Sequence, residues 1–407
     1  MSLLNILFIL IIFSYVTDVI LEYLNSMMRT TEMPVELKDI CDENKYKQTL
    51  KYSRANTIFG FITSSFNTLL LLLMLAIKGF AIVDEQIRLY FENPILIGVL
   101  FFAILAFASS LLGIPFSIYR TFIIEKKFGF NKTTVKTYIS DTIKSWILGG
   151  IIGGGLFALI IWLYSILESS FWLWAWLLIS VFSIFMAMFY TSLILPLFNK
   201  LKPLEDGELR QKIEAYSKKV HFKLNNIYVM NGSKRSSKAN AFFSGLGPAK
   251  KIVLFDTLIA QHDSNEIVSV LAHEVGHYKK KHSLMTTIAS VMQMGVMLYI
   301  FSLVASNPTL HTALGSQHQG FHLSLLTFAI LYGPVSMLIS IAFNYLSRRN
   351  EYQADAFAKQ TADGFSLQNA LKKISLHNLS NLKPHPLYVF FHYSHPPLLE
   401  RLKALNI

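Results

Sequence analysis

The chain has 407 residues, a formal net charge of +12 and a mean hydropathy of +0.42. Hydrophobic residues make up 53% and charged residues only 15%, which is more apolar surface than a soluble protein of this length can keep from water. The single cysteine, Cys41, excludes an intrachain disulfide and a thiolate metal cluster. We therefore expect a polytopic membrane protein in which any metal ligand is His, Asp or Glu.

Seven apolar stretches are long enough to cross a bilayer of ~30 Å as helices. We expect them at Leu3–Leu24, Ile58–Ile77, Pro94–Pro115, Trp146–Ile166, Phe171–Leu193, Ser283–Val304 and Leu323–Ile341. The first has no Lys or Arg ahead of it, so we interpret it as a retained span rather than a secretory signal. In the fourth, glycines offset by four residues within Gly149–Gly155 predict close packing against a neighbouring helix.

Lys and Arg are distributed unevenly among the connecting loops, and this bias predicts the orientation. The loops after the first and third spans each carry six, the long segment after the fifth carries many, and the others carry two or none. We expect the N-terminus outside and loops one, three and five and the C-terminus in the cytoplasm. This topology accounts for the positive charge without nucleic acid as a partner. The histidines between the last two spans are spaced too loosely for a metal site and are expected in solvent: His311, His318 and His322.

The longest non-apolar segment, Pro196–His282, contains helical and strand-like patterns. A helical pattern covers Gly207–Val220, and two short β-like runs, Asn226–Met230 and Ile252–Phe255, flank a turn-rich piece. After the N-cap candidate Asp263, apolar residues recur at helical spacing. This second predicted helix carries the sequence HEVGH.

The pentapeptide His273-Glu274-Val275-Gly276-His277 predicts a metal site. Histidines four residues apart stand one above the other on a helix face, so both imidazoles can reach one Zn²⁺ at about 2.0–2.1 Å. Zinc lowers the pKa of a water molecule towards ~7, and Glu274 is placed as the general base that takes its proton and passes it to the leaving amine. We expect one zinc ion per chain; a solvated helix with an incidental match is the alternative.

Catalytic zinc needs a third protein ligand and an open position. Just after the seventh apolar stretch, Glu351 and Asp355 are also four residues apart, on one helical face. Both helices leave the cytoplasmic surface in the predicted topology, so they can meet. We expect Glu351 to be the third ligand and Asp355 to orient a histidine imidazole. An ordinary charged face beside Arg348 and Arg349 is the alternative.

HEVGH, followed after two apolar stretches by EYQAD, resembles the M48 metalloproteases, specifically the CAAX prenyl protease 1 (Ste24) branch. Similar segments cover nearly the whole chain: Tyr119–Thr134, Leu195–Leu209, Ala239–Leu258 and Ser394–Leu402. The resemblance implies a mainly α, polytopic fold with seven transmembrane helices forming a barrel around a chamber. It also implies a zincin-like metalloprotease domain with a small β element on the cytoplasmic side. An N-terminal membrane domain with five transmembrane helices would cover residues 1–204, and an M48 peptidase domain with the last two would cover residues 205–407.

The resemblance also implies roles for residues outside the zinc motif. Asn240, Ala241 and Phe242 match the family's substrate-binding edge strand, on which an extended peptide pairs by β-augmentation, with Asn240 near the scissile carbonyl. His395 and Arg401 match positions close to the active site, where they would polarise the carbonyl oxygen or hold a substrate carboxylate. For His395, a histidine in a proline-fixed turn is the alternative.

Family members in eukaryotes remove the last three residues of prenylated CAAX proteins, and bacterial relatives are associated with membrane-protein quality control. The resemblance therefore implies an integral-membrane zinc metalloendopeptidase that acts on peptides or proteins, prenylated CAAX ends included, in contact with membrane lipid. The compact soluble segment and a tail without a dilysine signal favour a bacterial plasma membrane over the endoplasmic reticulum. One alternative is a quality-control protease with no prenyl requirement. The other is a multi-pass transporter with an incidental HExxH motif, which the nearly charge-free spans disfavour.

Overall fold

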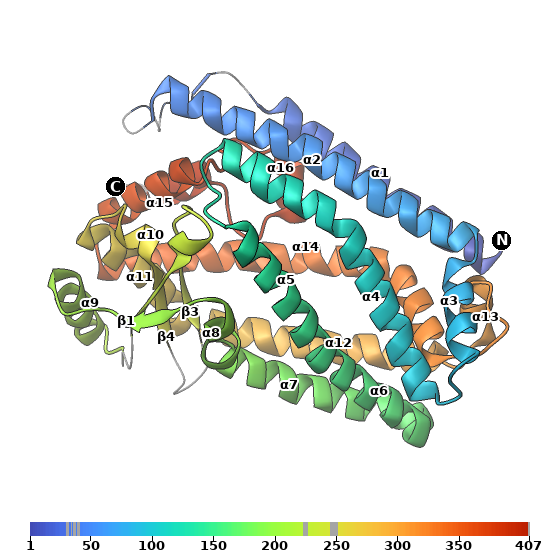
Figure 1. The fold of residues 1–407 in the computed structure, drawn as a ribbon. Coiled ribbons are helices and arrows are strands. Elements are labelled where there is room, and N and C mark those ends of the chain that lie inside the picture. The colour runs from blue at the N-terminus through green and yellow to red at the C-terminus, as the bar shows by residue number, and fades with distance from the viewer. Residues whose placement is uncertain are drawn as a thin grey trace.

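The computed structural model describes residues 1–29, 32–33, 35, 38, 41–222, 227–244 and 251–405. Long helices run side by side along the molecule, and a small sheet with short helices lies at one end (Figure 1). The predicted fold class, a mainly α membrane protein with a small β element, is confirmed.

Within the part of the chain that the structure describes, six helical segments are long and apolar enough to span a membrane. They are α1 (Leu3–Met27), α2 (Glu43–Ala76), the segment Pro94–Glu125 that begins with α4 (Pro94–Ile118), the segment Val135–Phe198, α12 (His282–Val304) and α14 (Phe321–Thr361). The segment Val135–Phe198 contains two of the seven expected spans, α6 (Gly154–Leu167) and α7 (Phe171–Leu193). The chain reverses between them at Glu168–Ser170, so α6 and α7 pack against each other (Figure 1).

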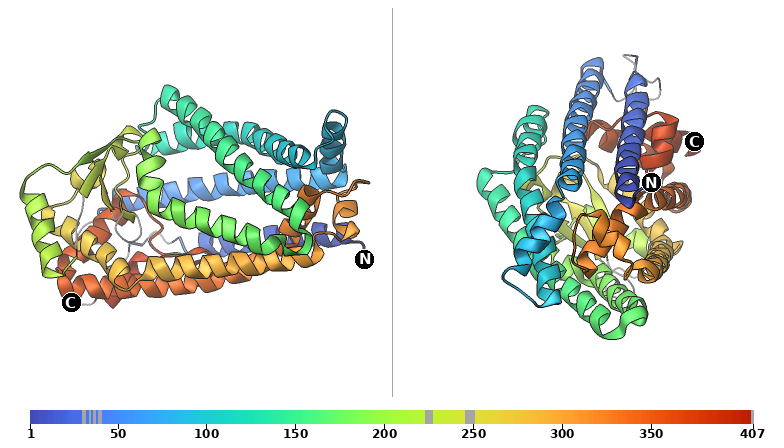
Figure 2. Two further views of the ribbon diagram at one scale, coloured as in Figure 1. Left: turned by 90° about the horizontal axis from the view of Figure 1, so that it is seen from below. Right: turned by 90° about the vertical axis from the view of Figure 1, so that its right-hand side faces the viewer.

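The spans close into a ring, which Figure 2 shows in its end-on view. Around the ring α1 packs on α2, α2 on the end of the α4 segment, α4 on α6, α6 on α7, α7 on α12, α12 on α14, and α14 on α1. In the most apolar window of each segment no more than 17% of the residues are buried, so the spans do not share a packed central core. A barrel around a chamber has this property, because each wall helix is uncovered on two sides.

The end of the ring opposite the sheet is closed by two short helices, α3 (Gly79–Arg88) and α13 (Pro308–Ala313) (Figure 1). There His322 Nε2 lies 2.8 Å from Asp84 Oδ1, and Arg88 Nε donates to Asp84 Oδ2 at 2.8 Å. His311 and His322 are buried, whereas His318 is exposed. The expectation that these histidines lie in solvent is therefore wrong for two of the three, because the buried Asp84 supplies His322 with a partner that periodicity does not reveal.

The glycine run of the fourth apolar stretch forms a π-helical turn, Gly149–Gly153, between α5 (Val135–Leu148) and α6. Among the described residues, no atom lies within 4 Å of a Cβ placed at Gly149, Gly150 or Gly153, and at Gly154 only Val99 Cγ1 does, at 3.9 Å. The expected close packing of a neighbouring helix against these glycines is therefore wrong. The run instead marks a local change of helix geometry.

The soluble region contains a four-stranded sheet in the order β1-β2-β4-β3. The strands are β1 (Leu201–Pro203), β2 (Ile227–Met230), β3 (Ala241–Ser244) and β4 (Lys251–Phe255). β2 and β4 match the two predicted runs, except that Asn226 lies outside the described residues. β1 precedes the predicted domain boundary at residue 204 but pairs antiparallel with β2. β3 lies at the edge opposite β1 and pairs antiparallel with β4, with Ala241 opposite Leu254, while no other described strand pairs with its outer side, which we call the free edge.

Short helices surround the sheet and the C-terminal region. They are α8 (Leu195–Phe198), α9 (Glu208–Lys219), α10 (Asp256–Ile259), α11 (Ser264–Lys279), α15 (Gly364–His377), α16 (Pro386–His392) and α17 (Leu398–Ala404). Asp263 is the N-cap of helix α11 and forms a capping box with Glu266. Helix α11 packs along α14, a single helix of 41 residues that runs from the last span through EYQAD. Glu351 and Asp355 therefore lie on the span helix itself, which fixes their position relative to the membrane.

Candidate active site

Close packing of α11 on α14 brings the HEVGH and EYQAD segments together. A Cβ at Gly276 would lie 3.1 Å from Ala354 Cα and 3.2 Å from Ala354 O, so only glycine leaves room for this approach. Ala354 is fully buried, and Val275 and Ala358 belong to the surrounding apolar core. The glycine inside the motif therefore has a packing role that the spacing of the histidines does not reveal.

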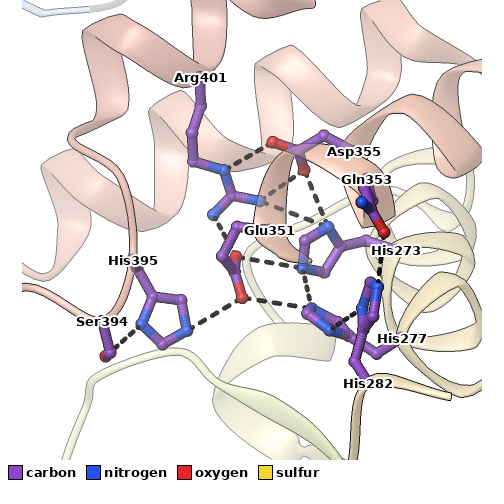
Figure 3. Close-up of polar contacts among 9 residues, drawn as sticks. All are labelled: His273, His277, His282, Glu351, Gln353, Asp355, Ser394, His395 and Arg401. Carbon is purple, nitrogen blue, oxygen red and sulfur yellow. Dashed lines mark hydrogen bonds and ion pairs between the residues drawn. The ribbon is translucent and has the colours of Figure 1, made fainter. Parts of the chain in front are cut away.

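Three side chains meet at this helix contact (Figure 3). His273 Nε2 and His277 Nε2 are 3.1 Å apart, His273 Nε2 is 3.4 Å from Glu351 Oε2, and His277 Nε2 is 3.2 Å from Glu351 Oε1. Glu274 lies between the histidines on α11 and is half-buried. The structure thus brings together the three residues that the sequence predicts as metal ligands.

The donor set fits a zinc ion. Ligand atoms at about 2.1 Å in a tetrahedral arrangement are separated by ~3.4 Å, close to the three distances observed. Glu351 Oε2 is buried and, among the described residues, accepts no hydrogen bond. A buried carboxylate oxygen in this state is costly unless cations compensate it, and a metal ion would add to the compensation by Arg401, whose Nη1 lies 3.5 Å away. His273, His277 and Glu351 also form a metal-compatible group by their mutual proximity.

Asp355 and Arg401 support the first histidine from the other side (Figure 3). His273 Nδ1 lies 2.8 Å from Asp355 Oδ1, so a proton on Nδ1 is held there and the Nε2 lone pair remains free to bind metal. Arg401 donates to both oxygens of Asp355, from Nε at 2.8 Å and from Nη2 at 2.6 Å, and its Nη1 lies 3.5 Å from Glu351 Oε2. These contacts direct the guanidinium toward the two carboxylates. A direct contact of Arg401 with substrate stays a prediction.

The electrostatics of the site favour cations. Burial lowers the pKa of His273, but hydrogen bonds to Asp355 and Glu351 outweigh burial and raise its pKa to about 9. Burial also lowers the pKa of Arg401, and the hydrogen bond to Asp355, with the nearby carboxylates of Glu351 and Glu274, raises it overall. The carboxylates that favour a proton on His273 would equally favour a metal ion beside it.

His395 reaches the site from the segment that follows α16. Its Nε2 lies 3.4 Å from Glu351 Oε1, its Nδ1 lies 3.0 Å from Ser394 Oγ, and its side chain is 66% exposed. This segment is held by α14, because Arg348 Nη1 donates to the Val389 and Tyr393 carbonyls at 3.0 and 2.5 Å. The structure therefore places His395 at the exposed side of Glu351, where a ligand can reach it.

No role was predicted for His282, the first residue of α12. Its Nδ1 lies 3.1 Å from His277 Nδ1 and its Nε2 lies 3.0 Å from Gln353 Oε1 (Figure 3). His282 thus supports His277 as Asp355 supports His273. The available signal was a third histidine five residues after the motif.

The predicted peptide-binding residues lie beside α11, which packs against β3. Ala241 and Phe242 begin β3, and Asn240 precedes it. Asn240 is exposed, and its Oδ1 accepts a hydrogen bond from the Ala241 N–H at 2.9 Å. These residues therefore lie on the free edge of the sheet, where an added strand could pair.

Replacing Gly276 by alanine is expected to destabilise the protein. Alanine normally stabilises a helix interior relative to glycine by ~1 kcal/mol, but here its Cβ would push α11 away from the Ala354 backbone, for a net cost of about 1–3 kcal/mol. The unfolding temperature in detergent and the amount of bound zinc per chain should both decrease. The control is Gly113→Ala in α4, where no described atom lies within 4 Å of the added Cβ. An unchanged or higher unfolding temperature for Gly276→Ala would contradict this account.

Acid is expected to weaken the start of α11 through His262. Its Nδ1 lies 3.0 Å from the capping Glu266, while its Nε2 is buried and has no partner among the described residues. Burial lowers the pKa of His262 below 6.5, so the neutral form is favoured in the folded protein. The contribution of neutral His262 to the free energy of unfolding is then complete above pH 6.5, and it is lost as the pH falls through the lowered pKa. The unfolding temperature, measured between pH 5 and 8, should fall at acidic pH. This fall should be smaller in the His262→Gln variant and unchanged in a variant of the exposed His221, His221→Gln.

Comparison with known proteins identifies the family. Residues 23–200 match the CAAX prenyl protease N-terminal region, which has five membrane helices, and residues 203–407 match peptidase family M48. A probable CAAX prenyl protease 1 from Schizosaccharomyces pombe is 35% identical over 92% of this chain and 82% of its own length. The human CAAX prenyl protease 1 homolog is 32% identical over 93% of this chain and 89% of its own length.

The crystal structure of S. mikatae Ste24p is similar to this fold along its whole length. The two superpose with a TM-score of 0.95 at 32% identity, with each chain fully covered. The resemblance predicted from HEVGH, EYQAD and the segments around them is thereby confirmed. The chain belongs to peptidase family M48 and is an integral, multi-pass membrane metalloendopeptidase.

Proposed function

We propose that one Zn²⁺ per chain is held by His273, His277 and Glu351, and that Glu274 is the general base of peptide hydrolysis. The observation that carries this proposal is that His273 Nε2, His277 Nε2 and the Glu351 carboxylate approach one another to 3.1–3.4 Å, while Glu351 Oε2 accepts no hydrogen bond among the described residues. Zinc, when bound, supplies the Lewis acidity that makes water a nucleophile at neutral pH.

The protein's own side chains then have separate roles in the reaction. Glu274 takes the proton of the attacking water and delivers it to the leaving amine nitrogen. Asp355 holds the Nδ1 proton of His273, and Arg401 holds Asp355 and balances its charge, so we assign Arg401 as a positioning residue. His395 donates a hydrogen bond from its exposed ring to the carbonyl oxygen or to a substrate carboxylate.

The proposed substrate is a peptide or protein with a C-terminal CAAX sequence, prenylated at its cysteine. The names of the relatives support this choice. We propose that Asn240, Ala241 and Phe242 bind the extended peptide, since they lie on the edge strand β3 or directly before it, with the backbone groups of Ala241 on the open side. The wall of the ring exposes large apolar side chains along its helices, among them Ile9, Phe13 and Ile58. Such surfaces suit membrane lipid on the outside and a prenyl chain within.

We propose that the active site faces the cytoplasm. The alternation of Lys and Arg between the loops supports this orientation, because the segment that bears the sheet and α11 is on the basic side. A bacterial plasma membrane remains our first proposal on the strength of the compact soluble segment. The eukaryotic origin of the relatives supports the endoplasmic reticulum as the alternative. Labelling of single cysteines in alternate loops of intact cells would test the orientation.

The test of the proposed function compares a farnesylated CAAX peptide with its unprenylated twin, using protein purified in detergent with zinc measured in parallel. Faster cleavage of the farnesylated peptide, lost with a chelator and restored by zinc, is expected. Equal cleavage of both peptides would indicate a quality-control protease. Bound zinc without cleavage of either peptide would contradict the proposed substrate class. If neither zinc nor cleavage were found, the transporter hypothesis would be favoured instead.

A further inference from the structure

The free edge of β3 offers backbone groups at every second residue. In an antiparallel pair, residues alternately face the partner strand and the open side. Phe255 N–H donates to Asn240 O at 3.1 Å, so Asn240 faces β4. The alternate residues therefore turn their N–H and C=O groups to the open edge: Ala239, Ala241 and Phe243. Each of them could form a pair of backbone hydrogen bonds with an added strand, and we call such a pairing position a rung.

One of these rungs is already occupied. The Ala239 N–H donates to Asn378 Oδ1 at 3.2 Å, and Asn378 Nδ2 donates to the Ala239 carbonyl at 3.3 Å. A single side-chain amide thus makes both hydrogen bonds that a neighbouring strand would make. At the next rung the Ala241 N–H donates to the exposed side chain of its neighbour Asn240, which can rotate away.

The Asn378 side chain is held by an unusual helix end. It caps α15, and the following residue, Leu379, has a φ of 52° although it is not glycine. Left-handed backbone is unfavourable for a bulky residue and persists where the surroundings enforce it. Leu379 is 2% exposed and packs with Tyr52, Ile124 and Phe130. Burial of Leu379 therefore fixes the backbone that presents Asn378 to Ala239.

The strand is anchored at the same place from the membrane region. Lys238, the residue before Ala239, donates to Tyr52 OH at 2.8 Å and to Glu125 Oε2 at 2.9 Å. Its carbonyl accepts a hydrogen bond from Thr257 Oγ1 at 2.9 Å. The Ala239 rung is thus a fixed point rather than a fraying strand end.

We propose that Asn378 is a specificity-determining residue that closes the Ala239 rung and limits how far an extended peptide pairs along the edge strand. This inference rests on the proposed function and on the position near the scissile carbonyl that the family resemblance implies for Asn240. A peptide that we propose to run antiparallel to β3, pairing with Ala241 and Phe243, then meets Asn378 immediately past the bond that is cut. Residues beyond that point must leave the strand, so Asn378 favours substrates with a short segment past the cut. A cavity of about 800 Å³ adjoins Asn378 and leaves room for that segment.

The experiment measures binding of a peptide ladder to full-length protein carrying Glu274→Gln, so that nothing is cut. Fluorescent peptides carry one to six residues past the CAAX cysteine, and affinity is measured by anisotropy. In protein that retains Asn378, affinity should stop rising with peptide length once the peptide is long enough to reach the Ala239 rung. With Asn378→Ala, longer peptides should gain a further three- to tenfold, the size expected of one additional backbone rung. Asn378→Asp keeps the acceptor for the Ala239 N–H but not the donor, so its gain should be intermediate.

The matched control is Asn381→Ala, three residues further on. Asn381 lines the same cavity, but its hydrogen bonds among the described residues go to Asn25 Oδ1 at 3.3 Å and to the Lys383 N–H rather than to the strand. The affinities of its peptide ladder should therefore match those of the parent protein. A merely structural effect of Asn378→Ala would weaken all peptides equally. The proposal would be overturned if affinity depended on peptide length in the same way in the parent protein and in Asn378→Ala. It would also be overturned if no peptide bound at all. If the ladder behaves as expected but the wild type cuts no peptide, the proposed substrate fails while the rung assignment stands.

Discussion

Replacing Glu351 by glutamine is expected to remove bound zinc and to reduce peptide cleavage to background. Loss of a residue that only orients a ligand costs ~10–100-fold in metal affinity, so loss of an anionic ligand should cost at least about 10³-fold. The neutral amide keeps the size of the side chain but not the charge that the buried site would use to hold a cation. Zinc per chain, measured by mass spectrometry after dialysis against a competing chelator, checks this directly.

The matched control is Glu400→Gln on α17. Glu400 is exposed and accepts a hydrogen bond from Tyr352 OH at 3.1 Å, one residue along α14 from Glu351. The same chemical change at this position should leave zinc content and activity within about twofold, as surface substitutions usually do. Stoichiometric zinc in Glu351→Gln, at the affinity of the wild type, would show that Glu351 is not a ligand.

Replacing Glu274 by glutamine is expected to leave zinc bound and to lower kcat by roughly 10²–10⁴-fold, the usual contribution of a general base. Glutamine has nearly the same shape as glutamate but cannot accept the proton. KM for the peptide should change little, because Glu274 is not among the residues proposed to pair with substrate. Steady-state kinetics together with zinc content separate this effect from metal loss.

His277→Ala provides the comparison, since it should lose zinc and activity together. If Glu274→Gln kept kcat within threefold of the wild type, another group would be the base. His395 is the first candidate in that case, because its ring is exposed and lies 3.4 Å from Glu351 Oε1. The double variant would then decide between the two.

The elements that the sequence predicted well depend on local periodicity. Apolar stretches long enough to span a bilayer became helices, and Phe171–Leu193 matches α7 in both bounds. The N-cap of α11 at Asp263 was predicted, but the start of α2 in water was not: α2 begins at Glu43, well before the expected Ile58, because Asp42 caps it outside the apolar run. HEVGH and EYQAD were each placed on one helix face for the same local reason, since residues four apart in a helix are neighbours.

Contacts that cross the chain were outside the reach of the pattern. Arg401 and Asp355 are separated by 46 residues, and Arg401 entered the prediction only through the family resemblance. His282 was overlooked because a spacing of five does not put two residues on one face of a continuous helix. The backbone at Lys281 has a φ of 60°, which ends α11 and directs the next helix so that His282 returns to His277.

The sequence by itself determined the class of protein, the membrane spans, the candidate zinc ligands and the candidate base, because hydrophobic length and helical spacing are local properties of the chain. Only the tertiary structure decided that Gly276 allows α11 to approach Ala354, that Arg401 and Asp355 support His273, and that Asn378 occupies the Ala239 rung. Each of these depends on the distance between backbones of separate elements. That distance is set by how whole helices pack, and no single segment of sequence contains it.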